Sequence, residues 1–144
     1  MKIAKHRQKI GKFILIANIV IFILIFILYA IGGFLTEELM EILKFLIPIK
    51  SIYMTALVKF IIANKKQILD EKSDNEELMP LYKTVTNIFV YTHIITLSLM
   101  IVFCAFNIIS FKFLINGIAI LETFFGAYIG LIITDMFKVE KNEE

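Results

Sequence analysis

The sequence predicts an all-α membrane protein, a single domain over residues 1–144 with four transmembrane helices and both termini in the cytoplasm. Three observations lead to this fold class. Of the 144 residues, 59% are hydrophobic and only 19% are charged, a balance typical of polytopic membrane proteins. The apolar residues are gathered in runs long enough to cross a bilayer. The lysines and arginines are concentrated beside alternate ends of these runs, as the positive-inside rule requires.

The first predicted span covers about residues 13–35 and follows the basic arm MKIAKHRQKIGK. At 1.5 Å per residue it reaches ~34 Å, enough to cross a hydrocarbon core of ~30 Å. An apolar run of 23 residues exceeds the usual hydrophobic region of a secretory signal, so we expect a span rather than a cleaved segment. Asn18 is its only strongly polar side chain, so most of this helix should face lipid.

The second predicted span covers about residues 45–63 and follows the acidic link TEELMEILK. Thr36 is expected to cap a short helix at the membrane surface. Pro48 is expected to mark a kink or a fresh helix start. The link and the span should therefore form a bent or a broken helix.

The second span also carries a polar face. Ser51, Thr55 and Lys59 recur every four residues, so this face should look into protein or water. Lys50 lies nearly opposite Lys59 around the helix. Each lysine has two interpretations: it extends to the nearer membrane surface, or it pairs with an acid or lines a pore within the membrane.

The third predicted span covers about residues 84–107 and is rich in hydroxyl groups, which tend to form hydrogen bonds between membrane helices. It also holds His93, which is either a hydrogen-bonded packing residue or a proton relay. Before this span, residues 64–83 form a polar segment of mixed charge. We expect a cytoplasmic loop there, offering a solvated or partner-docking surface.

The fourth predicted span covers about residues 113–137 and begins after a tight turn. Small residues fall along one of its sides and would let another helix approach closely. This stripe predicts a tight helix contact, within the chain or between subunits. Its members include Asn116, Thr123, Gly126 and Gly130.

Glu122 is the one acidic residue set deep in apolar sequence, and an ionisable group inside a membrane is a functional-site hypothesis. Counted from the outer ends of the predicted spans, Glu122 lies ~13 Å deep and Lys50 ~9 Å deep, both in the outer half of the membrane. A lysine side chain spans this difference. The two side chains are therefore expected to form an ion pair or adjoining rings of charge. The alternative is a protonated Glu122 that donates one hydrogen bond across a helix interface.

The basic residues assign the orientation. Five lie in the N-terminal arm, four in the loop 64–83 and two in the tail, whereas only Lys44 and Lys112 fall on the opposite side. The positive-inside rule therefore puts both termini and this loop in the cytoplasm. The outer loops are then very short, so little protein is available outside the membrane to bind an extracellular ligand.

The sequence offers little for catalysis or for metal binding. It lacks the motifs of zinc proteases, phosphate-binding loops and serine hydrolases. Cys104 is the only cysteine, and its ordinary role is that of a small buried apolar residue. His6 and His93 lie at different depths and share no metal site. We therefore predict no enzyme activity, no cofactor and no metal, and the composition does not indicate nucleic-acid binding.

Four segments give the chain a recognisable layout: the basic arm KIAKHRQKIGK, the stripe SIYMTALVK, the charged loop and the segment ETFFGAYIG. The layout is similar to that of the small four-span membrane effectors of bacterial anti-phage defence systems, and the likeness covers the whole chain in outline. It implies a bacterial inner-membrane protein that forms homo-oligomers and permeabilises the membrane, and it assigns no role to any residue. The small multidrug transporters also have four spans, but their embedded acid lies in the first span, where this chain has Asn18.

The leading functional prediction is a homo-oligomer in the lipid bilayer that conducts ions or permeabilises the membrane. A cytoplasmic protein or a nucleotide-like ligand acting on the loop 64–83 would open it. Two alternatives remain: a non-conducting accessory subunit that assembles another membrane complex, and a small exchanger with Glu122 as proton carrier. The candidate residues for the pore or the buried charge are Glu122, Lys50, Lys59, His93, Ser51 and Thr55.

Overall fold

A computed structural model of the chain describes residues 3–63 and 80–138. Within these ranges there are four α-helices and no strand: α1 (Ile3–Ala30), α2 (Thr36–Ala63), α3 (Pro80–Ala105) and α4 (Phe111–Lys138). The all-α fold class is thereby confirmed for this part of the chain. The predicted loop 64–83 lies outside the described residues except for 80–83, which open α3.

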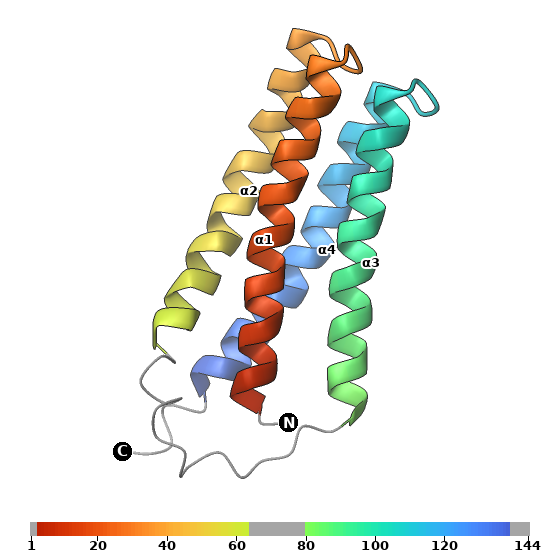
Figure 1. The fold of residues 1–144 in the computed structure, drawn as a ribbon. Helices are drawn as coiled ribbons and strands as arrows, with labels where there is room; N and C mark the ends of the chain where they lie inside the picture. The colour runs from red at the N-terminus through yellow and green to blue at the C-terminus, as the bar shows by residue number, and fades with distance from the viewer. Residues whose placement is uncertain (1–2, 64–79, 139–144) are drawn as a thin grey trace.

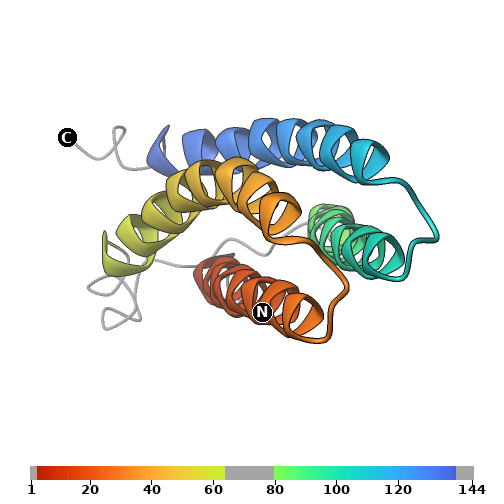
Figure 2. The same ribbon diagram turned by 90° about the horizontal axis from the view of Figure 1, so that it is seen from above.

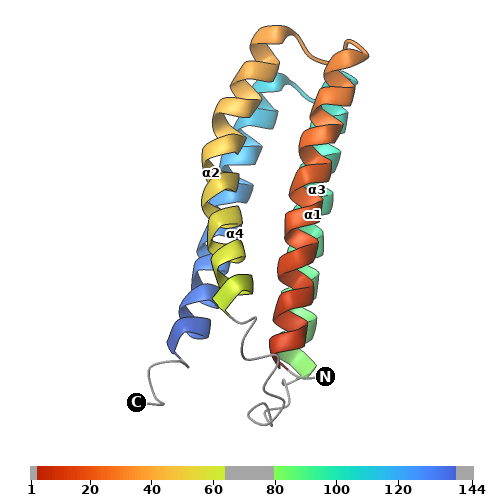
Figure 3. The same cartoon turned by 60° about the vertical axis from the view of Figure 1, so that its left-hand side comes forward.

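The four helices form two antiparallel hairpins that pack side by side (Figure 1). The turns 31–35 and 106–110 lie at one end of the bundle, the turn end. The N-termini of α1 and α3 and the C-termini of α2 and α4 lie at the other, the terminal end. Because α2 packs on α4 and α1 packs on α3, the bundle has two layers (Figure 2, Figure 3). Which side of a membrane the terminal end faces stays a prediction.

Three stretches are long and apolar enough to cross a membrane: Lys9–Ala30 in α1, Thr84–Ala105 in α3 and Phe111–Tyr128 in α4. They correspond to the first, third and fourth predicted spans, and they are compatible with an integral membrane protein. The described part of α2 supplies no fourth stretch of this kind. Its first half carries several charged side chains, and part of its second half has no described side chains. A second span within 45–63 therefore stays a prediction.

The start of α2 differs from the prediction. The helix runs without interruption from Thr36 through Pro48, so the acidic link and the second span belong to one helix. Thr36 is not the cap. The Leu35 N–H donates a hydrogen bond of 2.8 Å to Oε2 of Glu38, so this glutamate satisfies a backbone group that the first turn leaves free. The Thr36 hydroxyl lies 3.1 Å from the hydroxyl of Tyr29 instead.

The turn between α3 and α4 lies close to the predicted position. Asn107 takes a left-handed conformation with φ 57°, which ends α3 and reverses the chain. Ser110 then caps α4, because its side-chain oxygen accepts the N–H of Phe113 at 3.3 Å and its carbonyl accepts the N–H of Leu114 at 3.1 Å. Helix α4 therefore begins at Phe111, slightly before the predicted span.

The core next to the turn end is apolar on all four helices. It excludes water from this half of the bundle because its side chains are nearly or fully buried. Cys104 belongs to it, as a small buried residue. We call this set the turn-end core: Ile21, Ile25, Leu28, Phe34, Leu39, Ile42, Leu46, Leu97, Ile101, Cys104, Ala105, Leu114, Ile115 and Ile118.

The outward surface of α1 is apolar from Ile16 to the C-terminal end of the helix. Every exposed side chain from Ile16 to Ile31 is aliphatic or aromatic, and Ile23 and Phe26 are each about half exposed. A soluble bundle would place polar groups on such a face. This surface is compatible with the lipid contact that the sequence predicts for the first span.

The predicted small-residue stripe of α4 makes a close contact within the chain at Gly126. A Cβ at this position would overlap the hydroxyl oxygen of Tyr53 on α2. Asn116, Thr123 and Gly130 are exposed on the outside of the bundle. A contact of the stripe between subunits stays a prediction.

Two other glycines also lie close to atoms of a neighbouring element. A Cβ on Gly33 would lie 2.8 Å from Cβ of Ala105 and 3.0 Å from the carbonyl oxygen of Leu28. A Cβ on Gly117 would meet the end of the Met100 side chain. Gly33 is therefore the more constrained of the two, because rigid groups surround it whereas a methionine side chain can move aside.

Gly33→Ala should destabilise the bundle, because the added methyl group forces the two turns apart at the turn end. We expect the free energy of unfolding to fall by about 1–3 kcal/mol, the usual cost of overpacking. Thermal unfolding of the purified protein in detergent measures the change. Gly130→Ala is the matched control, since no atom lies within 4 Å of its added Cβ. Equal melting temperatures for the two variants would contradict the close packing at Gly33.

Candidate functional site

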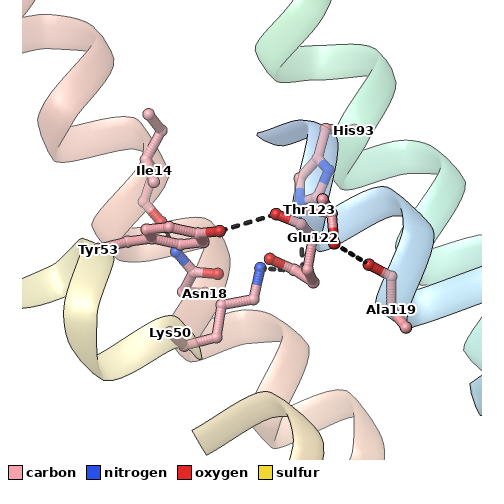
Figure 4. A network of polar contacts seen from close by, with 8 residues as sticks. All are labelled: Ile14, Asn18, Lys50, Tyr53, His93, Ala119, Glu122 and Thr123. Carbon is pink, nitrogen blue, oxygen red and sulfur yellow. Dashed lines mark hydrogen bonds and ion pairs between the residues drawn. The ribbon is translucent and has the colours of Figure 1, made fainter. Parts of the chain in front are cut away.

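A buried ion pair joins α2 to α4. Nζ of Lys50 lies 2.5 Å from Oε1 of Glu122, and the two side chains are 3% and 0% exposed (Figure 4). The predicted ion pair between these residues is confirmed as a contact. Removing two charges from water costs several kcal/mol per ion, which only a close partner offsets. The contact therefore fixes which faces of α2 and α4 point inward.

The pair lies near the middle of the bundle. Measured from the turn end along each helix, Lys50 is ~21 Å and Glu122 ~17 Å away at 1.5 Å per residue. Helices α2 and α4 have 28 residues each, or ~42 Å. Both helices begin before the predicted spans, α2 by a wide margin. The depth of the pair in a membrane stays a prediction.

His93 brings α3 into the same site. Its Nε2 lies 3.4 Å from Oε1 of Glu122, the oxygen that also contacts Lys50. The imidazole ring is stacked on Phe125 of α4, with ring centroids 3.9 Å apart and planes 11° from parallel. The position of the ring is thus set by packing, and its charge state determines how strongly it attracts the carboxylate. We call Lys50, His93 and Glu122 the charge cluster.

Tyr53 is a residue of the site that the sequence pattern did not single out. Its hydroxyl donates a 2.8 Å hydrogen bond to the backbone carbonyl of Glu122 (Figure 4). Tyr53 follows Lys50 by three residues and so shares its helix face. This spacing is the signal that was available in the sequence. The missing side chain of Gly126 leaves the room that the hydroxyl occupies.

Asn18 of α1 faces inward at a similar level. It is 4% exposed, and its amide donates a hydrogen bond of 2.9 Å to the carbonyl of Ile14 in its own helix. The polar group is satisfied locally, so it brings no charge to the cluster. The polar residue of the first span therefore marks the one side of α1 that does not face lipid.

Polar and aromatic groups continue from the cluster toward the terminal end. Phe125 stacks on Phe89, whose ring lies 4.1 Å from that of Tyr128. The Tyr128 hydroxyl donates a hydrogen bond of 2.9 Å to the hydroxyl of buried Thr86. On the opposite side of the cluster, the described side chains that are buried belong to the apolar turn-end core. The surroundings of the charge cluster are therefore different in the two directions along the bundle.

The charge cluster keeps unused hydrogen-bonding capacity. Lys50 and His93 approach Oε1 of Glu122 closely, but neither contact has the angles of a good hydrogen bond. Oε2 of Glu122 has no hydrogen-bond partner among the described residues. An ammonium group has three donors, and a carboxylate accepts at both oxygens. The cluster is thus held by charge more than by directed bonds, which lets its members exchange partners.

The other predicted site residues lie apart from this cluster. Ser51 and Thr55 are exposed on the outer face of α2. Lys59 belongs to α2, but its side chain lies outside the described residues. The predicted candidates therefore divide into an inner charge cluster and an outer polar face. Among the described residues no three His, Cys, Asp or Glu side chains come together.

Comparison of the chain with protein-family models, with curated proteins and with solved structures finds no match. Functional interpretation rests on the geometry of the site and on the surface of the bundle.

Lys50→Met or Glu122→Gln alone leaves the other charge buried without its partner. Each single variant should lower the free energy of unfolding by about 3–5 kcal/mol. The double variant removes both charges and should recover most of this loss. Unfolding curves in detergent of the unmodified protein, the two single variants and the double variant supply the double-mutant cycle.

Lys44→Met is the control for that cycle, because Lys44 is an exposed lysine on the same helix. Its effect should stay within about 0.5 kcal/mol, as for ordinary surface substitutions. A double variant that loses the sum of the two single losses would show that Lys50 and Glu122 do not interact.

Tyr53→Phe removes one buried hydrogen bond and leaves the carbonyl of Glu122 with one partner fewer. We expect a loss of about 0.5–1.5 kcal/mol in the free energy of unfolding. Tyr91→Phe makes the same chemical change at a residue that is 46% exposed and should have little effect. If the two substitutions cost the same, the Tyr53 hydroxyl does not hold α2 to α4.

Proposed function

We propose that this chain is an integral membrane protein of the bacterial inner membrane that assembles as a homo-oligomer and conducts ions between its subunits. Helix α2 lines the conduction path, and α4 makes the contact with the next copy. A signal from the cytoplasm opens the path. This mode of action is that of a membrane-permeabilising effector.

One observation carries the proposal: a stripe of exposed polar side chains runs along the outward face of α2, between exposed apolar side chains such as Met40 and Ile52. The polar positions recur at spacings of three, four and seven residues, which keeps them on one side of the helix. They extend over ~27 Å. Lipid offers such groups no hydrogen bonds, so the face requires water or another protein surface. Its members are Glu37, Glu41, Lys44, Ser51 and Thr55.

This face is also hollowed near the turn end. A surface cavity of about 630 Å³ lies there, lined by Thr36, Glu37, Met40, Glu41, Lys44 and Phe45 of α2. Both signs of charge and two hydrophobic side chains border it. Such a lining suits the mouth of a watery path between subunits, where ions exchange their hydration shells for polar groups.

The interior of one chain leaves no room for a path of its own. The turn-end core fills the bundle with apolar side chains from all four helices. Water in contact with this core would find no hydrogen-bond partner. A path for ions therefore runs between copies, along surfaces that are polar on the outside of each bundle.

The exposed stripe of α4 gives the neighbouring copy a place to pack. Asn116, Thr123 and Gly130 are exposed on the helix that lies beside α2. Small residues allow close approach of membrane helices, whose association gains little from the hydrophobic effect in lipid. A ring in which α4 packs on the next subunit turns the polar face of α2 toward the axis.

The cytoplasmic signal acts where α2 leaves the bundle. Helix α2 ends at Ala63 at the terminal end, and the charged segment 64–83 follows it in the chain. A cytoplasmic protein or a nucleotide-like ligand bound to this segment would pull directly on the helix that lines the path. Residues 64–79 lie outside the described part, so this step rests on their sequence alone.

Cysteine cross-linking tests the assembly, because Cys104 is the only native cysteine. In a Cys104→Ala background, Ser51→Cys or Thr55→Cys should give covalent oligomers in membranes treated with a short bifunctional thiol reagent. Ile23→Cys is the control, since Ile23 is 52% exposed on the apolar face of α1. Cross-linking from Ile23→Cys alone, or a monomer throughout, would falsify the arrangement around α2.

Ion flux tests the function in the same variants. Vesicles that contain Thr55→Cys should leak ions faster than protein-free vesicles, because a gated path is open in a small fraction of copies without its signal. A charged thiol-specific reagent should reduce or abolish the leak, because it attaches a bulky charge to the path. The Ile23→Cys vesicles should not respond to the reagent. An oligomer without leak would favour the accessory-subunit alternative. Substrate flux that depends on a proton gradient would favour an exchanger that uses Glu122.

A further inference from the structure

We infer that α4 of one copy packs along the exposed polar side of α2 in the next copy, with the side chains of the two helices matched level by level. The partner of the outer face of α2 is therefore a second copy of this chain. The contact rests on the residues of the two helices, and only its effect on ion flow rests on the proposed function.

The buried ion pair gives α2 and α4 a common scale of depth. Both helices begin at the turn end and run toward the terminal end (Figure 1, Figure 3). Lys50 and Glu122 meet in one contact, so they lie near one level. An α4 residue some positions before Glu122 therefore lies near the level of the α2 residue as many positions before Lys50. Copies inserted in a membrane in one orientation share this scale.

On this scale the exposed positions of the two helices coincide. Five exposed residues of α4 follow one another at intervals of three, four, three and four residues, and five exposed residues of α2 do so at the same levels. This spacing keeps each row on one side of its helix, and matched rows let the side chains of two parallel helices interlock. We call them the α4 row and the α2 row: Phe113, Asn116, Ile120, Thr123 and Ala127 in the first, and Glu41, Lys44, Pro48, Ser51 and Thr55 in the second.

Asn116 finds a polar partner in the α2 row. It lies at the level of Lys44, and it is an exposed amide within the apolar stretch Phe111–Tyr128. Lipid offers such an amide no hydrogen bond. Its carbonyl oxygen accepts hydrogen bonds, and the ammonium group of a lysine donates them. Packing of α4 on the α2 row therefore satisfies this side chain.

The middle of the two rows continues the match. Thr123 lies at the level of Ser51, and its hydroxyl donates a hydrogen bond of 2.7 Å to the carbonyl of Ala119. Its oxygen can still accept a hydrogen bond from the hydroxyl of Ser51. One level nearer the turn end, Ile120 meets Pro48, and both are apolar. Polar residues of one row thus face polar residues of the other, and apolar residues face apolar ones.

Near the turn end the two helices match in shape. Phe113 is 59% exposed and lies at the level of Glu41. The surface cavity of about 630 Å³ on α2 extends from Thr36 to Phe45, so this level is near its middle. Met40 and Phe45 give the cavity apolar walls that suit an aromatic ring. The ring of Phe113 from the next copy therefore fills this cavity.

The same cavity matches α4 in charge. Glu37 and Glu41 border it with two negative charges, and Lys44 borders it with one positive charge. Among the described residues, neither glutamate has an ion pair within its own chain. Lys112 is exposed beside Phe113 and brings a positive charge to the cavity from the next copy. The excess of one negative charge is thereby compensated.

Other surfaces of the chain match the α2 row less well. A second α2 would place Lys44 on Lys44 and Glu41 on Glu41, and like charges at one level repel. The outer face of α1 exposes only apolar side chains from Ile16 to Ile31. If α4 paired with a second α4, the charges of the α2 row would face lipid, which is costly. The α4 row of the next copy is therefore the partner that fits.

The contact closes the proposed path. It joins α4 of one copy to α2 of the next, and contacts of this head-to-tail kind form rings where the rotation closes. Because α2 and α4 share one layer of the bundle (Figure 2), this layer faces the axis of the ring. The α4 row then covers Ser51 and Thr55, and Phe113 fills the mouth. A pull on α2 at its C-terminal end separates the two rows and opens the path.

Disulfide trapping between two single-cysteine proteins tests the contact. In a Cys104→Ala background, Ser51→Cys with one affinity tag and Thr123→Cys with another are reconstituted together. Mild oxidation should give a mixed disulfide, because the Cα atoms of bridged cysteines lie within about 7 Å. Such a product joins two copies, since each protein has one cysteine.

Two further mixtures are the controls. Ser51→Cys with Asn116→Cys tests the level, because Asn116 lies seven residues before Thr123, or ~10 Å nearer the turn end. Ser51→Cys with Ile23→Cys tests the face, because Ile23 lies on the apolar side of α1. Neither should give a mixed disulfide. The contact is overturned if Ser51→Cys and Thr123→Cys do not join, if Asn116→Cys joins equally well, or if Thr123→Cys joins only to itself.

Charge reversal tests the match at the cavity. Glu41→Lys or Lys112→Glu alone should lower the yield of the mixed disulfide by about two- to fivefold, the size expected for an exposed ion pair. The two changes together exchange the charges and should restore the yield. Lys12→Glu, at an exposed lysine of α1, is the control and should leave it unchanged. A double variant with a lower yield than either single variant overturns the charge match.

Ion flux separates the contact from its role in closing the path. Vesicles in which the mixed disulfide has formed should leak ions more slowly than the same vesicles after reduction. An equal or faster leak in the oxidised vesicles overturns the closing role. If the disulfide forms at the expected level but neither state leaks more than protein-free vesicles, the contact stands and the proposed conduction fails.

Discussion

The contact between Lys50 and Glu122 is the constraint on which the rest of the bundle depends. A charge in an apolar interior is tolerated only beside its partner, so α2 and α4 are held in one register and with one pair of faces inward. Turning Lys50 inward turns Ser51 and Thr55 outward, because they lie about a quarter turn or more away around the helix. The rotation of α2 about its own axis therefore determines both which charge is buried and which polar side chains lie outside.

Much of the fold follows from the sequence because hydrophobic runs and isolated charges are local signals. Three apolar helices and the pairing of Glu122 with Lys50 could be predicted, since a lone acid in such a run needs a cation at a reachable depth. The helix limits could not. Helix α2 begins at Thr36, well before the apolar part that marks the predicted span, and runs through Pro48 without interruption.

The remainder of the site depends on contacts that no periodicity reveals. Tyr53 carries the same amphipathic character as an interfacial tyrosine, and only the packing of α2 on α4 brings its hydroxyl to the carbonyl of Glu122. Gly126 and Gly130 occupy equivalent positions in the stripe, yet a Cβ added to Gly126 would overlap the Tyr53 hydroxyl, whereas one added to Gly130 would meet no atom within 4 Å. The rotation of α4 about its axis determines which glycine permits a close approach. The buried charges set this rotation, and the small-residue stripe does not.

Pro48 gives α2 a mechanical property that the other helices lack. It lies within the helix two residues before Lys50, and it supplies no N–H for the carbonyl of Lys44. A helix with one backbone bond missing bends there at lower energy than elsewhere. Leu39, Ile42 and Leu46 anchor the part before the proline in the turn-end core. The part of α2 after Pro48 can pivot about the proline while the anchored part stays in place. A small displacement of the Lys50 ammonium therefore becomes a larger displacement at the C-terminal end of the helix.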